Sequence, residues 1–335
     1  MGVTVGVIGL GRIGAFHSET LSTLPGVDGL VVTDERPTVT ESVATKLGAT
    51  AVENAAAMLA SGVDGVVVAA ATPAHAALVL ACVDAGIPVF CEKPIAATPA
   101  ESLAVAAGIE SSGVEVQIGY NRRFAPAFAA AKNAAASGDL GWLHTVRSTT
   151  LDPAPPPLEY VAVSGGIFRD CSVHDFDIVR WIVGHEVTEV YAAGSNQGDP
   201  KFTEYGDVDT ATTTLTFENG TIGVVSNTRY NARGYDCRLE VHGSNDAVVA
   251  GWDEQVPVRN LEAGTTFPNG TPHAFFMDRF SSAYQVELSA FVDVIAGRIP
   301  SPCTPRDALE VAYIAEAASL SMHQHRPVRI DEVRL

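Results

Sequence analysis

The stretch VTVGVIGLGRIGAFHSETLSTL, residues 3–24, decides the fold of the first part of the chain. Val3 to Ile8 is a short run, β-branched and apolar almost throughout, which is typical of a strand buried on both faces of a parallel sheet. The glycine-rich loop Gly9–Gly14 follows, and residues 15–24 predict a helix that ends at the next Pro-Gly pair. Strand, glycine loop and helix in this order predict a nucleotide-binding βαβ unit.

The same alternation continues outward to residue 119. Short apolar runs predict strands, and the segments between them predict helices. We expect strands at 30–33, near 51, and at 65–71, 88–91 and 114–119, with helices at 37–47, 74–85 and 99–112. This order predicts an α/β Rossmann domain over residues 1–120.

A different pattern begins at residue 121. Longer, partly alternating strands are expected at 143–150, 187–193, 210–217, 220–229 and 237–243, with helices at 125–137 and 174–183 and loops over 260–279. This pattern predicts a second domain over 121–335, of the α+β class, with a large, mostly antiparallel open sheet. The open face of that sheet is expected to expose apolar area in a monomer.

The bulk composition excludes several classes of protein. A chain of 335 residues is long enough for two domains with their own cores. A net charge of -18 without a basic stripe argues against a nucleic-acid partner. No apolar run reaches the length of a membrane span and no basic signal region opens the chain, so a cytoplasmic location is expected.

The cysteines and histidines do not form a recognisable metal site. Cysteines stand at 82, 91, 171, 237 and 303 without a CxxC pair, and the chain has no HExxH motif. We expect reduced thiols and no bound metal.

Each glycine of the loop has a physical role in the predicted site. Gly9 permits a tight turn, Gly11 lets a pyrophosphate approach the backbone, and Gly14 lets the helix pack on the strand. Backbone N–H groups at the helix start then meet the anion. Such a loop alone is weak evidence for a nucleotide site, but here a predicted buried strand precedes it and a predicted helix follows it.

Asp34 stands 20 residues after Gly14, at the end of the second predicted strand. A carboxylate there accepts hydrogen bonds from the adenosine ribose and repels a 2′-phosphate, which favours NAD over NADP. Arg36 is either a solvated side chain or a group that reaches such a phosphate, so some use of NADP stays open.

Two further loops leave the carboxyl ends of predicted strands. Thr72-Pro73-Ala74-His75 follows the strand that ends at 71, and Glu92-Lys93-Pro94 follows the strand that ends at 91. Open α/β sheets bind their ligands at this edge. Lys93 is either a hydrogen-bond donor inside the pocket or an ordinary surface lysine, and spacing alone does not separate the two.

Residues 165–177, GGIFRDCSVHDFD, carry a candidate acid–base pair. If the segment is helical, Asp170 and His174 lie four residues apart on one face. A histidine can take the proton of a hydroxyl while hydride leaves the same carbon, and a neighbouring carboxylate can orient the imidazole. The alternative is a helix N-cap acid followed by a buried core histidine.

These motifs together resemble the Gfo/Idh/MocA oxidoreductase family, across nearly the whole chain. The resemblance is carried by GLGRIG at 9–14, EKP at 92–94, GYNRRF at 119–124 and the pair Asp170 and His174. Within the family, the chain is most similar to inositol 2-dehydrogenases, through Asp152-Pro153, SGGIF at 164–168, GYD at 234–236, DRF at 278–280 and Ala283-Tyr284.

The resemblance implies NAD-dependent oxidation of a secondary hydroxyl of a cyclic polyol, myo-inositol or a related inositol, by a homotetramer. It implies a catalytic group in which His174 is the general base, Asp170 supports it and Lys93 positions the hydroxyl. The implied substrate residues are Asn121, Arg123, Asp152, Asp170, His174 and Tyr235. The predicted cofactor residues are Gly9, Gly11, Arg12, Ile13, Gly14, Asp34, Thr72, Pro73, His75, Glu92 and Lys93.

Two positions depart from the family pattern and leave the substrate open. Ala74 stands where family members often carry Asn or Thr, and Leu151 stands where inositol enzymes usually carry Arg. A dehydrogenase of a sugar or glycoside in the same family is therefore an alternative. A non-catalytic NAD-sensing regulator is a second one, although a sensor needs no proton acceptor.

Overall fold

The computed structural model describes residues 2–335 and divides into two compact units. The first unit holds the chain up to Asn121, together with Ser282–Glu310 and Leu335. The second unit holds Arg122–Ser281 and Val311–Arg334. The division predicted at residue 120 did not anticipate that residues 282–310 return to the first unit.

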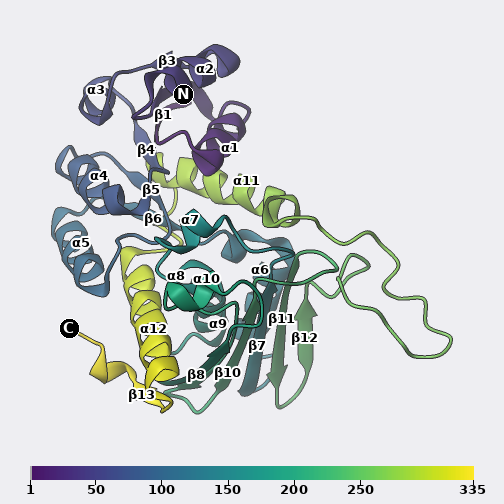
Figure 1. Ribbon diagram of the computed structural model, residues 1–335. Helices are drawn as coiled ribbons and strands as arrows, with labels where there is room; N and C mark the ends of the chain where they lie inside the picture. The colour runs from purple at the N-terminus through teal and green to yellow at the C-terminus, as the bar shows by residue number, and fades with distance from the viewer. Residues whose placement is uncertain (1) are drawn as a thin grey trace. The chain divides into compact units, whose positions relative to one another are not determined.

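The first unit is built on a six-stranded parallel sheet of strand order β3-β2-β1-β4-β5-β6 (Figure 1). Its strands are β1 (Val3–Ile8), β2 (Val27–Thr33), β3 (Thr50–Ala51), β4 (Gly65–Val68), β5 (Val89–Glu92) and β6 (Val116–Gly119). Its helices include α1 (Arg12–Leu21), α2 (Pro37–Leu47), α3 (Ala55–Ala60), α4 (Thr72–Asp84) and α5 (Pro99–Ser112). The predicted Rossmann domain is confirmed, and the strand order reverses between β1 and β4, where such sheets bind ligands.

Several element boundaries differ from the sequence prediction, and two of them lie at loops that carry predicted site residues. Helix α1 begins at Arg12 instead of residue 15, because Gly11 is its N-cap and the last glycine of the loop is already helical. Strand β4 ends at Val68 instead of 71, and α4 begins at Thr72 with Pro73 in its first turn. Proline fits the first turn of a helix because the N–H group that it lacks has no intrahelical partner there.

Helix α11 (Phe276–Ile295) supplies part of the core of the first unit. The predicted loop ends at residue 275, and the helix that follows carries a non-helical residue, Phe280. Beyond Ser282, α11 buries Leu288 and Phe291 in one cluster with apolar residues of β1, β4 and β5. A Cβ atom on Gly65 would lie 2.3 Å from Ile295, so β4 and α11 are in close contact.

We predict that Phe291→Ala lowers the free energy of unfolding by about 3–5 kcal/mol, because it leaves a cavity in a fully buried cluster. Urea unfolding followed by circular dichroism measures this loss. Val286→Ala, on an exposed position of the same helix, is the matched control. A loss below about 1 kcal/mol for Phe291→Ala contradicts the packing of α11 in this core.

The second unit is built on a seven-stranded sheet of order β12-β11-β7-β10-β9-β8-β13. Its strands are β7 (Leu143–Leu151), β8 (Val187–Ser195), β9 (Thr210–Phe217), β10 (Ile222–Thr228), β11 (Asp236–Gly243), β12 (Ala247–Ala250) and β13 (Val328–Arg329). Neighbours are antiparallel except β7 and β10, which are parallel. The prediction of a mostly antiparallel sheet is confirmed.

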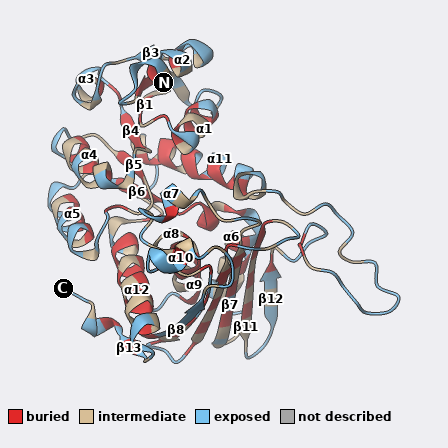
Figure 2. Ribbon diagram, viewed as in Figure 1, coloured by how far each residue is buried: buried red, intermediate tan, exposed pale blue. Residues whose placement is uncertain are grey.

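Helices pack against one face of this sheet, and Figure 2 shows buried residues running through its strands. The helices with residues in this unit are α6 (Pro126–Ser137), α7 (Leu158–Val161), α8 (Ile167–Asp170), α9 (Val173–Val183), α10 (Lys201–Glu204) and α12 (Pro305–Gln324). Two 3-10 helices are η1 (Asn121–Phe124) and η2 (Ile330–Glu332). Contacts of α6 and α9 with β7, β10, β11 and β12 form the covered side.

The opposite face carries hydroxyl groups where apolar area was expected. In β9 the alternate residues Ala211, Thr213, Leu215 and Phe217 are buried. The residues between them, at 210, 212, 214 and 216, are all threonines and are exposed or half-buried. The expectation of an apolar face is therefore wrong for this strand, because threonine has the β-branched shape that a strand favours and also a polar group.

No helix within residues 2–335 has both the length and the apolar character that a membrane crossing requires.

Candidate functional site

The loop between β1 and α1 requires two of its glycines for internal reasons. Gly9 has a φ of +89°, in the left-handed region, and a Cβ atom there would lie 2.6 Å from the backbone of Ala70. A Cβ atom on Gly14 would lie 1.8 Å from the carbonyl oxygen of Gly9. The helix can pack against the loop only because both positions lack a side chain.

Gly11 has no such internal reason. Its φ of -66° and ψ of -169° are open to any residue, and a Cβ atom there would meet nothing within 4 Å. The space where a side chain would stand lies at the N-cap of α1, where the first N–H groups of a helix face an anion. The residues present therefore fit a dinucleotide pyrophosphate, which needs this close approach to the backbone.

Asp34 is held beside this loop at the end of β2. Its Oδ2 atom accepts a hydrogen bond of 2.7 Å from the N–H of Leu10, and its Oδ1 atom accepts one of 2.9 Å from Nε of Arg36. Burial raises the pKa of Asp34. The hydrogen bonds and charge of Arg36 and the hydrogen bond from Leu10 together outweigh this effect, so the pKa of Asp34 lies below its ordinary value. The carboxylate is therefore ionised, and Arg36 is exposed to solvent but paired with it.

His75 joins two strand-end loops at the same edge. Its Nδ1 atom lies 2.7 Å from the carbonyl oxygen of Pro94, and its Nε2 atom lies 2.9 Å from that of Ala70. The side chain is buried and contacts backbone on both sides. The predicted cofactor residues Thr72 and Pro73 form the first turn of α4, and His75 holds that turn to the segment around Lys93.

Glu92 is bound to α1 through a histidine that the sequence analysis did not single out. Nε2 of His17 lies 2.7 Å from Oε1 of Glu92, and the imidazole is fully buried among the rings of Phe90 and Tyr284. Because a carboxylate accepts hydrogen bonds, Nε2 is the nitrogen that donates. The only signal in the sequence was the position of His17, three residues after the glycine loop. Lys93, which follows Glu92, belongs to this first unit.

In the second unit, residues 165–177 form two helices and not the single helix considered above. Helix α8 ends at Asp170, and α9 begins at Val173 with Ser172 as its N-cap. The alternative that Asp170 is an N-cap is also wrong. His174 is the second residue of α9, and the N–H of Ile167 in α8 donates 2.9 Å to Oδ1 of Asp207, which anchors the start of that helix.

Asp170 lies in a cluster with a second predicted residue and one that the sequence analysis missed. Nη2 of Arg229 donates 2.6 Å to Oδ2 of Asp170, and Nη1 donates 2.9 Å to Oδ2 of Asp152. The hydroxyl of Tyr160 donates 2.9 Å to Oδ1 of Asp170. We refer to Asp152, Arg229 and Asp170 as the carboxylate cluster. The structure thus brings together two of the predicted substrate residues.

The strand pattern explains why these residues meet. Asp152 directly follows β7 and Arg229 directly follows β10, and the parallel register pairs Leu151 with Thr228. Tyr235 precedes β11, whose first residue Asp236 also pairs with Leu151. The parallel β7–β10 pair was the signal that could have identified Arg229, but the expected sheet was mostly antiparallel.

Burial and charge act in opposite directions in this cluster. Burial raises the pKa of Asp152, the charge of Asp170 raises it further, and Arg229 lowers it, with a net rise. Burial opposes the charge on Arg229, whereas Asp170 and Asp152 help to raise its pKa above the ordinary value. Burial also raises the pKa of Tyr235, so its phenol is neutral and can donate a hydrogen bond.

Arg123, another predicted substrate residue, is occupied by a buried ion pair. Its Nε atom donates 2.9 Å to Oδ2 of Asp177 on α9, and its guanidinium lies over the ring of Trp181. Both partners of the pair are almost fully buried. The arrangement ties η1 to α9, which is a structural role. Asn121 is buried at the start of η1.

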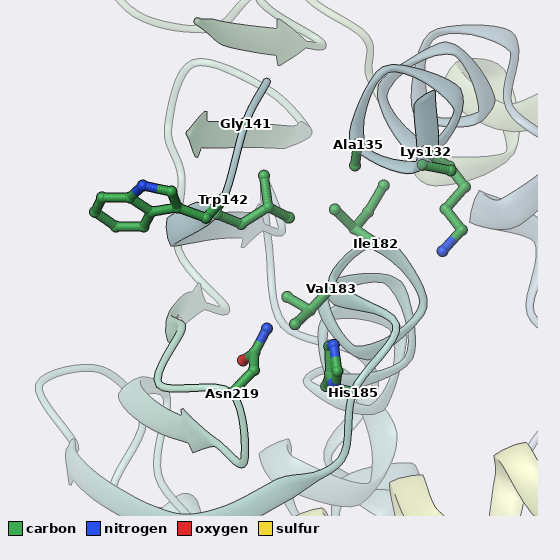
Figure 3. Close-up of a pocket in the computed structure, with 10 residues that line it drawn as sticks. Lys132, Ala135, Gly141, Trp142, Ile182, Val183, His185 and Asn219 are labelled. Carbon is green, nitrogen blue, oxygen red and sulfur yellow. The ribbon is translucent and has the colours of Figure 1, made fainter. Parts of the chain in front are cut away.

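The second unit also contains a pocket of about 400 Å³ (Figure 3), none of whose lining residues belongs to the carboxylate cluster. It is lined by Lys132, Trp142, Leu143, His185 and Asn219, among others. Leu143 starts β7, whereas Asp152 follows its end, so nine residues of strand separate the two places. Within residues 2–335, no group of three or more His, Cys, Asp or Glu side chains is arranged to hold a metal ion.

Substitution of Gly11 and substitution of Gly14 by alanine are predicted to have different effects. Gly11→Ala should fold with unchanged stability but bind NAD at least about tenfold more weakly, because a methyl group occupies the pyrophosphate space. Gly14→Ala should lose stability, because its methyl group meets the Gly9 carbonyl. Calorimetric titration with NAD and thermal unfolding separate these effects. Unchanged NAD affinity in a folded Gly11→Ala variant would argue against the pyrophosphate position.

Comparison with family models matches both units. Residues 3–120 match the model described as "Oxidoreductase family, NAD-binding Rossmann fold". Residues 128–249 match the model described as "GFO/IDH/MocA C-terminal domain".

Relatives and solved structures align over almost the full length of this chain. The chain is 37% identical to a myo-inositol 2-dehydrogenase of Thermotoga maritima, over 98% of this chain and 99% of that protein. It is 34% identical to the scyllo-inositol 2-dehydrogenase (NAD(+)) of Bacillus subtilis, over 99% and 97%. The crystal structure of a scyllo-inositol dehydrogenase from Lactobacillus casei, with bound NAD(H) and scyllo-inositol, aligns with a TM-score of 0.89 at 27% identity, over 99% and 100%.

Proposed function

Because this chain belongs to the Gfo/Idh/MocA family of NAD-binding oxidoreductases, we propose that it oxidises one secondary hydroxyl of an inositol, such as myo-inositol, to the ketone. The family resemblance carried by the sequence motifs is thereby confirmed. The first unit is the NAD-binding Rossmann domain of this NAD-dependent dehydrogenase. The observation that carries the substrate proposal is the carboxylate cluster, which presents acceptors to a hydroxyl-rich ligand and whose Asp170 stands four residues before His174.

The residues of the first unit bind and select the cofactor. NAD, when bound, accepts the hydride that leaves the carbon of the substrate. The backbone at Gly11 and the start of α1 hold the pyrophosphate, and the ionised Asp34 accepts hydrogen bonds from the ribose hydroxyls. The same negative charge repels a 2′-phosphate, while Arg36, already paired with Asp34, offsets that repulsion only in part.

Acid–base chemistry falls to three side chains. In this proposal Lys93 donates a hydrogen bond to the reacting hydroxyl, and His174 takes its proton as the hydride departs. Asp170 supports His174 in its role as the base. Asp152 accepts a hydrogen bond from another hydroxyl of the substrate, and Tyr235 donates one. One proton on His174 and one hydride on NAD account for the two hydrogens that the alcohol loses.

The assembly and location are part of the same proposal. We propose a homotetramer in the cytoplasm, as the sequence motifs that resemble this family imply. The threonine-rich face of the second sheet is the surface we assign to subunit contact, because flat β-branched faces pack well on one another. Light scattering coupled to gel filtration measures the number of subunits.

A sugar or glycoside is the second candidate substrate, and the observation that favours it is Leu151. This residue pairs with Thr228 and Asp236 at the edge where Asp152 leaves β7. A leucine there removes a cationic donor from the surroundings of the carboxylate cluster, so the set of hydroxyls that fits can differ from that of other inositol enzymes.

We expect Asp34→Ala to weaken NAD binding much more than NADP binding, because the ribose acceptor and the negative charge are lost together. Arg36 then has no carboxylate partner and can pair with a 2′-phosphate. Parallel titrations with NAD and NADP measure the ratio of the two affinities. Asn54→Ala, which removes the side-chain cap of α3, is a control at a different place in the unit. An unchanged ratio would remove Asp34 from this role.

The reaction itself is tested by NAD reduction, followed at 340 nm, with myo-inositol, scyllo-inositol and glucose side by side. Turnover with an inositol supports the proposal, turnover with glucose alone supports the sugar alternative, and no turnover across a wide polyol panel supports an NAD sensor. His174→Ala should lower kcat by about 100-fold or more while NAD still binds. Near-normal turnover in His174→Ala or in Lys93→Ala would remove that residue from its assigned role.

A further inference from the structure

We propose that Arg229 is a positioning residue of the reaction, whose buried guanidinium joins Asp152 to Asp170 and keeps both carboxylates aligned and ionised. This inference rests on the proposed function, in which Asp170 supports His174 and Asp152 binds substrate. Arg229 is 4% exposed and was not among the residues that the sequence motifs indicated.

Backbone hydrogen bonds fix the positions of Asp152 and Arg229. The N–H of Asp152 donates 2.9 Å to the carbonyl of Thr228, and its carbonyl accepts 2.7 Å from the N–H of Asn231. The N–H of Arg229 donates 2.8 Å to the carbonyl of Asp209. Both side chains therefore start from fixed points at one edge of the sheet, which lowers the entropic cost of their contact.

The geometry of the contact needs a guanidinium. Two different nitrogens of Arg229 donate to two different carboxylates, Nη1 to Asp152 and Nη2 to Asp170. A lysine ammonium is a single point charge on a flexible stem and lacks this planar fork. Arg229 occupies only one oxygen of each carboxylate. The second oxygen of Asp170 accepts from the hydroxyl of Tyr160, and a substrate hydroxyl is a donor of the same kind.

The balance of charge in the cluster depends on the same residue. Two carboxylates share one guanidinium, and burial raises the pKa of Asp152. The other titratable or charged groups that act on the cluster are the Cys171 thiol, Asp207, Tyr235 and Arg122. Cys171 and Asp207 are neutral or negative in every protonation state, and the guanidinium of Arg122 is paired with Asp175, so Arg229 is the cation that contacts the two carboxylates.

Loss of the guanidinium charge has a predictable sign. Two buried carboxylates without their shared cation repel each other, so the pKa of the pair rises and one proton is retained to higher pH. Because the reaction needs the ionised form, the acidic limb of the kcat profile moves to higher pH. A residue that only fills space would not move this limb.

The experiment measures kcat and KM with the inositol substrate from pH 5 to 10 in the full chain. Arg229→Gln, which keeps a donor but no charge, should lower kcat about 100-fold at pH 7 and move the acidic limb up by about one unit or more. NAD affinity should not change. Arg180→Met is the matched control, because it breaks the pair of Arg180 with Glu186 in the same unit. It should leave the acidic limb in place.

A double variant tests the charge argument directly and covers the case in which Arg229→Gln does not fold. Arg229→Gln with Asp152→Asn has the same net charge in the cluster as the natural chain, so its acidic limb should return towards the natural position. KM for the inositol should be higher than in the natural chain, because the substrate loses the Asp152 carboxylate. A double variant that keeps a displaced limb, or a single variant with natural kcat and limb, overturns the role of Arg229.

Failure of this inference and failure of the proposed function give different results. If Asp170→Asn abolishes turnover while Arg229→Gln behaves like the natural chain, only the inference about Arg229 is wrong. If Asp170→Asn and His174→Ala also turn over normally, the assignment of the reaction site is wrong.

Discussion

The contact between Gly14 and the carbonyl oxygen of Gly9 is the constraint on which the cofactor unit depends. At this distance a single methyl group is excluded, so α1 can start directly above the end of β1. That start places Gly11 at the helix N-cap, and it places His17 six residues further along, about 1.7 helical turns, within hydrogen-bond distance of Glu92. One backbone contact therefore sets both the anion-binding end of the helix and the residue next to Lys93.

The second unit solves a similar problem with strands. The residues of its carboxylate cluster come from the ends of β7 and β10 and from α8, and the buried Arg229 joins them. In the first unit the corresponding connections are made by the buried histidines His17 and His75. Burying three charges is unfavourable unless each is paired, and here each carboxylate has a hydrogen-bonded partner. Apolar replacements of buried ion pairs are often neutral or stabilising, so this cluster supports the proposed role of the two carboxylates as ionised acceptors.

The sequence predicted what depends on local pattern and motif. The glycine loop, the alternation up to residue 119 and the strand–helix content of the second part were sufficient for the two fold classes, and the motifs were sufficient for the family. The return of α11 to the first unit was not predictable, because Leu288 and Phe291 find their partners far away in the chain. The single helix expected at 165–177 is wrong for a different reason, since α8 ends at Asp170 and a separate helix, α9, begins at Val173. Between them the hydroxyl of Ser172 donates to Asn227 of β10, a partner 55 residues away that local periodicity does not show.

The missed site residues share a cause. His17 and Glu92 are 75 residues apart, and Arg229 and Asp152 are 77 residues apart, so neither contact leaves a spacing that a motif can show. Arg123 shows the converse, because its motif indicated a ligand contact and the fold gives it Asp177 as a partner. For Arg229 and Asp152 the missing information was the parallel register of β7 and β10.

That register has a consequence for how the chain can vary. Side chains on a strand alternate between its two faces, so one residue inserted into or removed from β10 would turn Arg229 away from Asp152. Loops around the cluster can lengthen without this penalty, because they leave the register intact. The alignment of Arg229 with Asp152 thus depends on the lengths of β7 and β10. Among related chains, sequence changes that alter the substrate should therefore occur in the loops and not in these two strands.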